Sequence, residues 1–470
     1  MGEIMTNPYL SGVLRQPRQL LFPILFFSCA APETSPVQPE ELIDHVAARA
    51  ADASLARSAA ELAAIPPLEL NLPDVDVELD PTSSQFWRVC AYAWNPAVRQ
   101  ARQEVLMALA RQQSAGAPDP VGVRVVDHEF GGDSALVESV ATFDLLGILG
   151  VGESAAEQAQ ADVRVLRARC RLEQELWSAR FVVERARVRL AAVRARQELL
   201  RVLGTELRED MERFRILQLN RRLSDAEWGL ISAREDLLLQ KLSLLASEEA
   251  ALRHELAVAA GLPIDHPALD RPAIDALTDL GPTVELPSSA RLLETHPRLR
   301  YLRLDVAEAE AQLRTIAASA IPGIRMGPHL SWPGSGTQLG GALQLTLPLP
   351  SQWRGEIEAA LIERTARIQQ LEDELLSHGS LARTAQLRCE EARVRQEEHA
   401  VAVQNAASES WRATRLRFRV GQATSRDWLR ALDAQMLAVV LGVNSTATEH
   451  IATLDVLELA GPAVDTGDQS

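Results

Sequence analysis

Lysine is almost absent from this chain of 470 residues, because Lys241 is the only one and arginine carries the rest of the basic charge. The formal net charge is −16. A nucleic-acid-binding protein needs a basic surface to neutralise phosphates, so this balance argues against a nucleic-acid partner. Aromatic residues make up only 4% of the chain, which is low for a large compact core. Alanine, leucine, arginine and glutamate dominate instead, as in long helices and coiled coils.

Motifs for catalysis and metal binding are also missing. The four cysteines stand too far apart for a zinc knuckle or a redox CxxC pair. The nine histidines have no metal-ligand spacing. The chain contains no P-loop, HExxH or GxSxG motif. We therefore expect no enzyme activity, no metal and no cofactor.

The N-terminus has the features of an export signal. Arg15 and Arg18 precede a short apolar run, 20–27, which ends at Ser28-Cys29-Ala30. This pattern resembles a bacterial lipoprotein signal, in which Cys29 would carry a lipid anchor and begin the mature chain. The alternatives are a plain cleaved signal and a true start at Met5. No run of 18 apolar residues occurs, so we expect no transmembrane helix.

Proline is absent from two long stretches, 121–262 and 351–461. Proline inside a helix costs about 3 kcal/mol, so these stretches favour long helices, which we predict over 153–203 and 356–420. Apolar residues recur there at spacings of three and four. Helices of roughly sixty-five residues span roughly 100 Å, too long for one compact domain. They indicate a coiled coil, a helical wall or a tube.

The two halves of the chain match each other. Three pairs recur in the same order: Asn95-Pro96 with His296-Pro297, Trp228 with Trp428, and Gly261 with Gly461. The last two pairs are each separated by 200 residues, which indicates an internal duplication. We predict a signal peptide at 1–29, a collar or linker segment at 30–94, repeats at 95–263 and 295–462, a proline-rich linker at 264–294 and a tail at 463–470.

Each repeat contains a predicted β-hairpin, at about 118–145 and 322–349. In the second hairpin, apolar residues alternate strictly with small or polar ones over about ten residues per strand. This pattern is typical of a transmembrane β-barrel wall with an apolar face toward lipid and a polar face toward a water-filled lumen. We assign the polar face to the lumen: Arg325, His329, Gln338, Gln344 and Thr346. The alternative is a small soluble hairpin packed on helices, because Pro328 and paired glycines interrupt the strands.

Several segments together resemble the outer-membrane efflux proteins typified by TolC. They are Asn95-Pro96, His296-Pro297, Leu345-Thr346-Leu347-Pro348-Leu349 followed by Gly355, Phe418-Arg419-Val420-Gly421 and Asp427-Trp428-Leu429. The resemblance runs from about residue 95 to 462. It implies an α+β fold, an internally duplicated protomer in which two β-hairpins contribute four strands to a shared trimeric 12-stranded barrel. Long α-helices would form a periplasmic coiled-coil tunnel.

The resemblance also implies a function. The chain would be a passive channel subunit in the outer membrane of a Gram-negative bacterium, serving a tripartite efflux or type I secretion system. Its partners would be two further copies in a homotrimer, outer-membrane lipid, a periplasmic adaptor protein and an inner-membrane transporter. The alternative function is a periplasmic coiled-coil scaffold or adaptor without a channel.

Four residues take roles from the resemblance. Val420 and Gly421 match the periplasmic tip turn where the adaptor docks, and Asp427 matches the first acidic position of the aperture constriction. The second acidic position is Arg430 here, so salt bridges between the two would replace a purely acidic gate. The first repeat has 220–223 at the corresponding turn, without the glycine, and we expect a differently built turn there.

Overall fold

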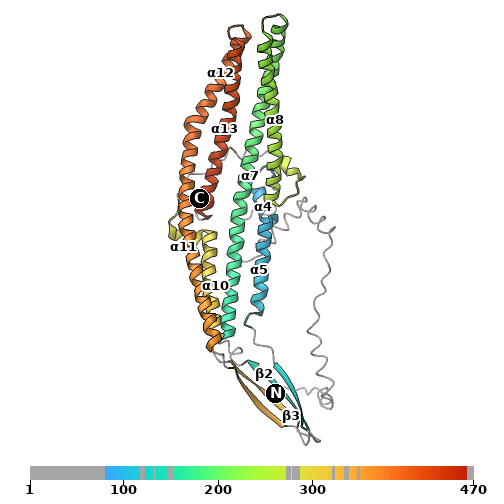
Figure 1. Cartoon of the computed structure of the whole chain (residues 1–470), viewed down its shortest axis with the longest axis vertical. Coiled ribbons are helices and arrows are strands. Elements are labelled where there is room, and N and C mark those ends of the chain that lie inside the picture. The colour runs from blue at the N-terminus through green and yellow to red at the C-terminus, as the bar shows by residue number, and fades with distance from the viewer. Residues whose placement is uncertain are drawn as a thin grey trace, which may run out of the picture. The chain divides into compact units, whose positions relative to one another are not determined.

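The structure is a computed structural model that describes residues 80–116, 122–130, 134–144, 152–270, 277, 286–319, 323–332, 338–346 and 350–462. Up to the linker, the elements are α4 (Ser84–Trp94), α5 (Pro96–Ser114), β1 (Gly122–Phe130), β2 (Ser134–Asp144), α7 (Glu153–Leu219), α8 (Asp225–Ala260) and the 3-10 helix η4 (Pro267–Asp270). Beyond it they are α9 (Ser289–Thr295), α10 (Pro297–Ser319), β3 (Gly323–Trp332), β4 (Gln338–Thr346), α11 (Pro350–Val394), the π-helical turn η6 (Arg395–Ala400), α12 (Val401–Arg419) and α13 (Ser425–Ala460). Figure 1 shows these elements.

The element order confirms the internal duplication. Each repeat runs from a helix through two strands into a long helix, a turn and a last helix. The last helices, α8 and α13, both contain 36 residues. Both begin with a capping box, in which a Ser or Thr side chain and an acidic side chain three residues later exchange hydrogen bonds. Both are followed by a glycine with positive φ, at Gly261 and Gly461.

The long helices are confirmed, and the first extends further than predicted. α7 contains 67 residues and continues to Leu219, past our boundary at Leu203. Gly204 does not end it, because this glycine is buried against α8. A Cβ atom at Gly204 would lie 3.3 Å from the Leu238 side chain, so a residue without a side chain permits the close approach. In the second repeat, α11, η6 and α12 follow one another without a break.

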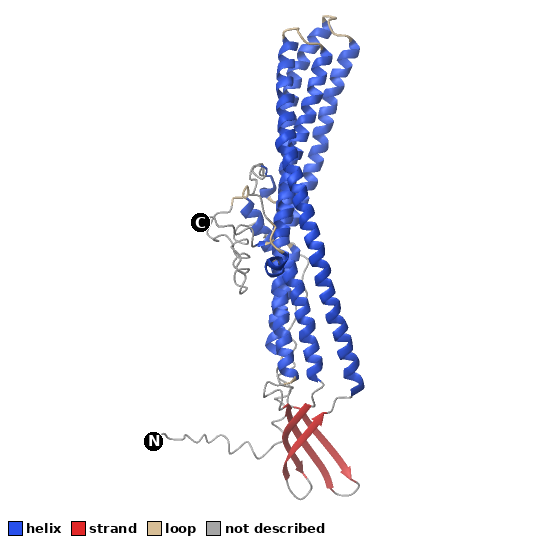
Figure 2. Cartoon of the chain, turned by 90° about the vertical axis from the view of Figure 1, so that its left-hand side faces the viewer, coloured by secondary structure: helices blue, strands red, loops and turns tan. Residues whose placement is uncertain are grey.

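Helix α7 is the element around which both repeats pack. It contacts α4, α5 and α8 of the first half and α10 and α13 of the second. Figure 2 shows the helices side by side and the strands gathered in one sheet. None of the described helices is long and apolar enough to cross a membrane.

The segment predicted as a collar or linker, 30–94, ends in a packed helix. Its residues up to 79, with Cys29 before them, lie outside the described residues. Phe86, Trp87 and Trp94 of α4 are buried in a core shared with α5, α7 and the end of α8. The Trp87 indole also donates a hydrogen bond to the Pro81 carbonyl, 2.8 Å away. The end of this segment is therefore part of the helical core.

The four strands form one antiparallel sheet in the order β1-β2-β3-β4. Strands β1 and β4 are its edges, with no strand partner on their outer sides among the described residues. The inner strand β3 contains Pro328, which has no N–H to donate. Pairing between β2 and β3 is interrupted there, since Val140 pairs with His329 and the next pair is Phe143 with Met326. The sheet tolerates the proline by giving up ladder bonds at that point.

Candidate functional site

Two helix-to-helix turns, 220–224 and 420–424, form what we call the tip. Gly421 has a φ of +78°, and its counterpart Arg221 has a φ of +53°. Matching backbone hydrogen bonds close both turns: Arg221 N to Gln218 O (2.9 Å) and Arg222 N to Leu217 O (2.8 Å), and Gly421 N to Phe418 O (3.0 Å) and Gln422 N to Arg417 O (2.7 Å). Our expectation of a differently built first turn is wrong, because an arginine adopts the conformation that glycine adopts in the second.

Exchanging the residue type at these two positions should therefore have opposite effects. A left-handed backbone costs a non-glycine residue roughly 1–2 kcal/mol, and glycine loses part of that gain through its freer unfolded chain. We expect Arg221→Gly to raise the free energy of unfolding by up to about 1 kcal/mol and Gly421→Ala to lower it by about 1 kcal/mol. A Cβ atom at Gly421 would meet no other atom within 4 Å, so a steric clash does not complicate the comparison. Urea denaturation followed by circular dichroism measures both, and effects of the same sign would contradict the shared turn geometry.

Asp427 is held at the first turn of α13. Its carboxylate accepts hydrogen bonds from the Thr424 backbone N (3.2 Å) and Oγ1 (2.7 Å). The Asp427 backbone N in turn donates to Thr424 Oγ1, 3.2 Å away. These hydrogen bonds, with the positive charges of Arg430 and Arg417, lower the pKa of Asp427. The carboxylate is therefore ionised and engaged in capping the helix, where a negative charge is also favoured by the helix dipole.

Arg430 lies one turn further along α13, on the same exposed part of the tip. It forms no ion pair with Asp427, or with any other residue that the structure describes. Val420 and Gly421 are exposed at the turn itself. The structure thus places all four residues predicted for docking and constriction at one tip.

A buried carboxylate, which the sequence did not reveal, joins the two halves just below the tip. Asp210 of α7 is 0% exposed. It accepts hydrogen bonds from Arg415 Nε (2.7 Å), Arg419 Nη2 (3.2 Å) and the Trp428 indole (3.2 Å). Because these donors come from α12 and α13, the carboxylate connects the first helical hairpin to the second.

Aromatic side chains surround this carboxylate. The Trp428 ring packs edge-on against Phe214 and Trp411, at centroid distances of 5.0 and 5.4 Å. The Trp411 indole donates to Glu206, 2.7 Å away. Trp428 is fully buried, whereas its repeat counterpart Trp228 is only partly buried against the same cluster. Apolar contacts exclude water here, so each charged hydrogen bond is stronger than it would be on the surface.

Strands β3 and β4 separate polar from apolar residues as predicted. The cross-strand register places the five proposed lumen residues on one face, in the pairs Arg325–Gln344, His329–Gly340, Ser331–Gln338 and Gly323–Thr346. The other face carries the pairs Met326–Leu343, Leu330–Leu339 and Ile324–Leu345. Leu339 and Leu343 are 77% and 70% exposed. One protomer thus leaves large apolar side chains of its sheet uncovered.

Two histidines and a tryptophan bind the end of α13. The carbonyl of Glu458 accepts from Trp177 Nε1 (2.9 Å) and His296 Nε2 (3.2 Å), and the carbonyl of Leu459 accepts from His378 Nε2 (2.9 Å). The His296 and His378 rings lie 4.3 Å apart, centroid to centroid. Burial, with the charges of His378 and Arg298 nearby, lowers the pKa of His296 to about 4.

This pKa makes stability depend on pH. Between about 4 and 6.5 the unfolded chain protonates His296 and the folded chain does not, so the folded state loses stability as the pH falls through that window. Above about pH 6.5 His296 is neutral in both states, and this effect no longer changes with pH. The stability lost between there and about pH 4 is about 3 kcal/mol. We expect the melting temperature to fall more between about pH 7 and about pH 5 in the native chain than in His296→Gln. Equal falls in melting temperature in the two proteins would contradict the lowered pKa of His296.

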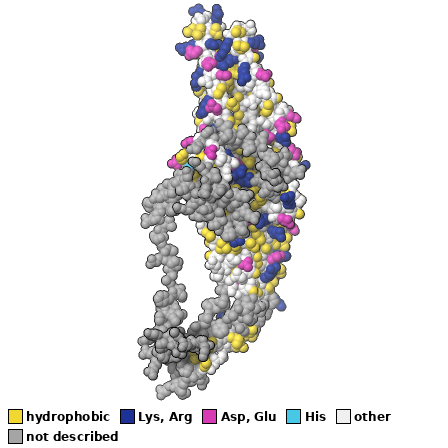
Figure 3. Space-filling model, turned by 180° about the vertical axis from the view of Figure 1, so that it is seen from behind, with side chains coloured by type: hydrophobic (Ala, Val, Ile, Leu, Met, Phe, Trp, Pro, Cys, Tyr) yellow, Lys and Arg dark blue, Asp and Glu magenta, His cyan; other side chains and the backbone are white. Residues whose placement is uncertain are grey.

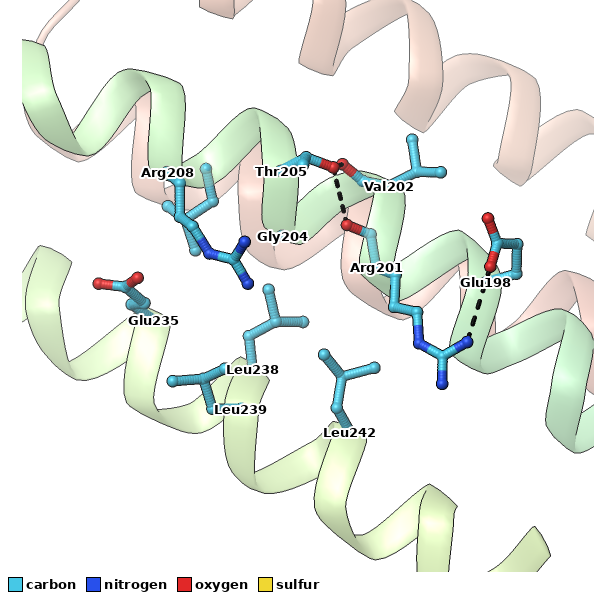
Figure 4. A pocket seen from close by; sticks show the side chains of 11 residues that line it. Glu198, Arg201, Val202, Gly204, Thr205, Arg208, Glu235, Leu238, Leu239 and Leu242 are labelled. Carbon is cyan, nitrogen blue, oxygen red and sulfur yellow. Dashed lines mark hydrogen bonds and ion pairs between the residues drawn. The ribbon is translucent and has the colours of Figure 1, made fainter.

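A shallow groove between α7 and α8 has a volume of about 500 Å³. Figure 4 shows apolar side chains along its floor, among them Leu238 and Leu242, and charged side chains at its margins. Glu198 and Arg201 face each other there at 3.8 Å. The described residues contain no group of three or more His, Cys, Asp or Glu side chains able to hold a metal ion. The groove has the character of a helix surface and lacks convergent catalytic groups.

Comparison with known proteins identifies the architecture. Neither a protein-family model nor a curated protein sequence matches this chain. Among solved structures, the outer-membrane channel OprN is 16% identical and superposes with a TM-score of 0.69, over 81% of this chain and 90% of that one. The MtrE outer membrane channel of Neisseria gonorrhoeae is 17% identical, with a TM-score of 0.67 over 81% and 89%. The outer membrane protein VceC of Vibrio cholerae is 15% identical, with a TM-score of 0.64 over 80% and 96%.

The chain has the fold of the TolC-like outer-membrane channels. The match spans nearly the full length of those proteins and about four fifths of this chain. The similar structures are channels and membrane proteins rather than enzymes. The resemblance in the sequence rested on short segments in a fixed order, and the channel fold confirms it.

Proposed function

We propose that this protein is the passive outer-membrane channel subunit of a tripartite efflux or type I secretion system in a Gram-negative bacterium. Three copies would form a duct, and long helices would extend it into the periplasm. A periplasmic adaptor and an inner-membrane transporter would supply cargo and energy. The protein itself would carry out no catalysis. Cys29 would carry a lipid anchor if the export signal is of the lipoprotein type.

The four-stranded sheet is the observation that carries this proposal. An open sheet edge is not viable in lipid, because its backbone N–H and C=O groups find no partner there. Strands β1 and β4 are such edges, and four strands are too few to close a barrel. Three copies together supply twelve. The exposed leucines of β4 then face lipid, and Arg325, His329, Gln338, Gln344 and Thr346 face water.

In this proposal, the tip residues contact the adaptor and surround the entrance of the channel. Val420 and Gly421, exposed at the second turn, would contact the adaptor. Asp427 and Arg430 would lie around the aperture through which cargo enters. The Asp210 network lies beside these residues and holds the second hairpin on the first, so it would fix the position of the aperture residues.

Extraction from purified outer membranes tests the proposal. The chain should resist release by high salt, leave the membrane in detergent and have the native mass of a trimer. The double variant Arg325→Glu, His329→Glu should assemble in the same way, because these residues face the lumen. A monomer or dimer released by salt would favour the alternative, a periplasmic coiled-coil scaffold or adaptor.

A further inference from the structure

The tip of the second hairpin carries positive charge against the trend of the chain. Residues 412–430 contain six arginines and a single acidic residue, Asp427, whereas the whole chain has a formal net charge of −16. The corresponding segment of the first hairpin, 212–230, is nearly balanced, with four arginines and three acidic residues. Figure 3 shows basic side chains gathered at the end of the molecule that holds both turns. The excess charge therefore belongs to the second hairpin.

Internal ion pairs neutralise only part of this charge. Arg415 and Arg419 bind Asp210 and Glu209, and so belong to the network below the tip. The other four are exposed and form no ion pair within the described part of the chain: Arg412, Arg417, Arg426 and Arg430. No ion pair among the described residues neutralises these four charges, and Arg426 acts at longer range on the Glu227 carboxylate of α8.

The single acidic residue of this segment is already engaged. Asp427 uses its carboxylate to cap α13 through two hydrogen bonds from Thr424. Arg417 near the end of α12 and Arg430 in the second turn of α13 are exposed on either side of the same tip turn, and the charges of both lower the pKa of Asp427. Two positive charges beside one negative charge leave this part of the tip net positive in each protomer.

We propose that the aperture of this channel is selective for anions, and that its cargo is a class of negatively charged solutes. The proposal rests on the proposed function, since only a channel has an aperture. Three copies would place Arg417, Asp427 and Arg430 around one axis, and rings of arginine favour anion passage. A narrow entrance with low-dielectric walls concentrates ions of the opposite sign.

Reversal potentials of the detergent-purified trimer in planar bilayers test the proposal. Under a KCl gradient, the native channel should reverse near the chloride equilibrium potential. Arg417→Gln combined with Arg430→Gln should shift the reversal potential toward that of potassium, and Arg430→Asp should shift it further. The matched control is Arg99→Gln combined with Arg111→Gln, which removes the same two charges per protomer from exposed positions of α5. It should leave the reversal potential unchanged.

The outcomes separate this proposal from the function on which it rests. Native channels that conduct and reverse near the potassium equilibrium potential would overturn anion selectivity and leave the channel function intact. An equal shift in the α5 control would also overturn it, because the tip arginines would have no special role. A native chain that never opens a conductance would contradict the channel function itself. The native measurement decides the question even if a variant fails to fold.

Discussion

Replacing Asp210 with alanine is expected to lower the free energy of unfolding of the tip region by about 3–5 kcal/mol. The carboxylate is fully buried, and its removal leaves the Trp428 indole without its acceptor. Arg415, whose side chain is only 13% exposed, would then have only the more exposed Glu206 and Glu209 to balance its charge. An uncompensated buried charge costs far more than the loss of a surface ion pair. The two helical hairpins should then separate at the tip while the core around α4 stays folded.

Glu209 is the matched control for this prediction. It neighbours Asp210 and also contacts Arg415 and Arg419, but its side chain is 67% exposed. Glu209→Ala should cost less than about 1 kcal/mol, as is usual for exposed ion pairs. Hydrogen exchange should show lost protection at 206–216 and 411–430 in Asp210→Ala only. Unchanged protection in Asp210→Ala, or equal losses in the two variants, would show that the buried network does not hold the hairpins together.

The architecture was predictable because its signals are local. Long stretches that lack proline and are rich in alanine, leucine, arginine and glutamate favour long helices. Apolar residues alternate with small or polar ones along both predicted strands of the second hairpin, within 324–345. This alternation predicted two strands, and the register confirms which residues share a face. The duplication was visible because the pairs Trp228–Trp428 and Gly261–Gly461 stand at one offset. Each of these patterns depends only on residues close together in the sequence or on a fixed spacing.

The Asp210 network was not predictable because its partners are distant. Asp210 and Arg415 are separated by 205 residues, and nothing in either segment marks them as partners. In the sequence Asp210 is one acidic residue among many on a charged helix, most of them exposed. Only the packing of α12 and α13 on α7 makes it a buried acceptor. The turn at Arg221 was mispredicted for a related reason, since the tertiary structure imposes a backbone conformation that the residue type alone disfavours.

Adjacent substitutions on β4 should differ in their consequences for membrane assembly, one disrupting it and the other leaving it nearly unchanged. Leu343 and Gln344 lie on opposite faces of the sheet, and the Leu343 side chain is 70% exposed in one protomer. If that face meets lipid, Leu343→Arg should destabilise the assembled barrel by about 2–4 kcal/mol near the bilayer midplane. Gln344→Arg would face water instead. Its cross-strand partner is Arg325, and repulsion between them costs less than about 1 kcal/mol.

The measurement is the yield of trimer extracted by detergent from outer membranes, together with the temperature at which the trimer dissociates. Leu343→Arg should lower both, while Gln344→Arg should match the native protein. A soluble hairpin would place both side chains in water and tolerate both arginines equally, so equal behaviour would contradict a membrane role for the sheet. A defect confined to Gln344→Arg would show that the face carrying Gln344, and not the face carrying Leu343, meets lipid. Two neighbouring residues on one strand thus test the orientation of the sheet without disturbing the helices.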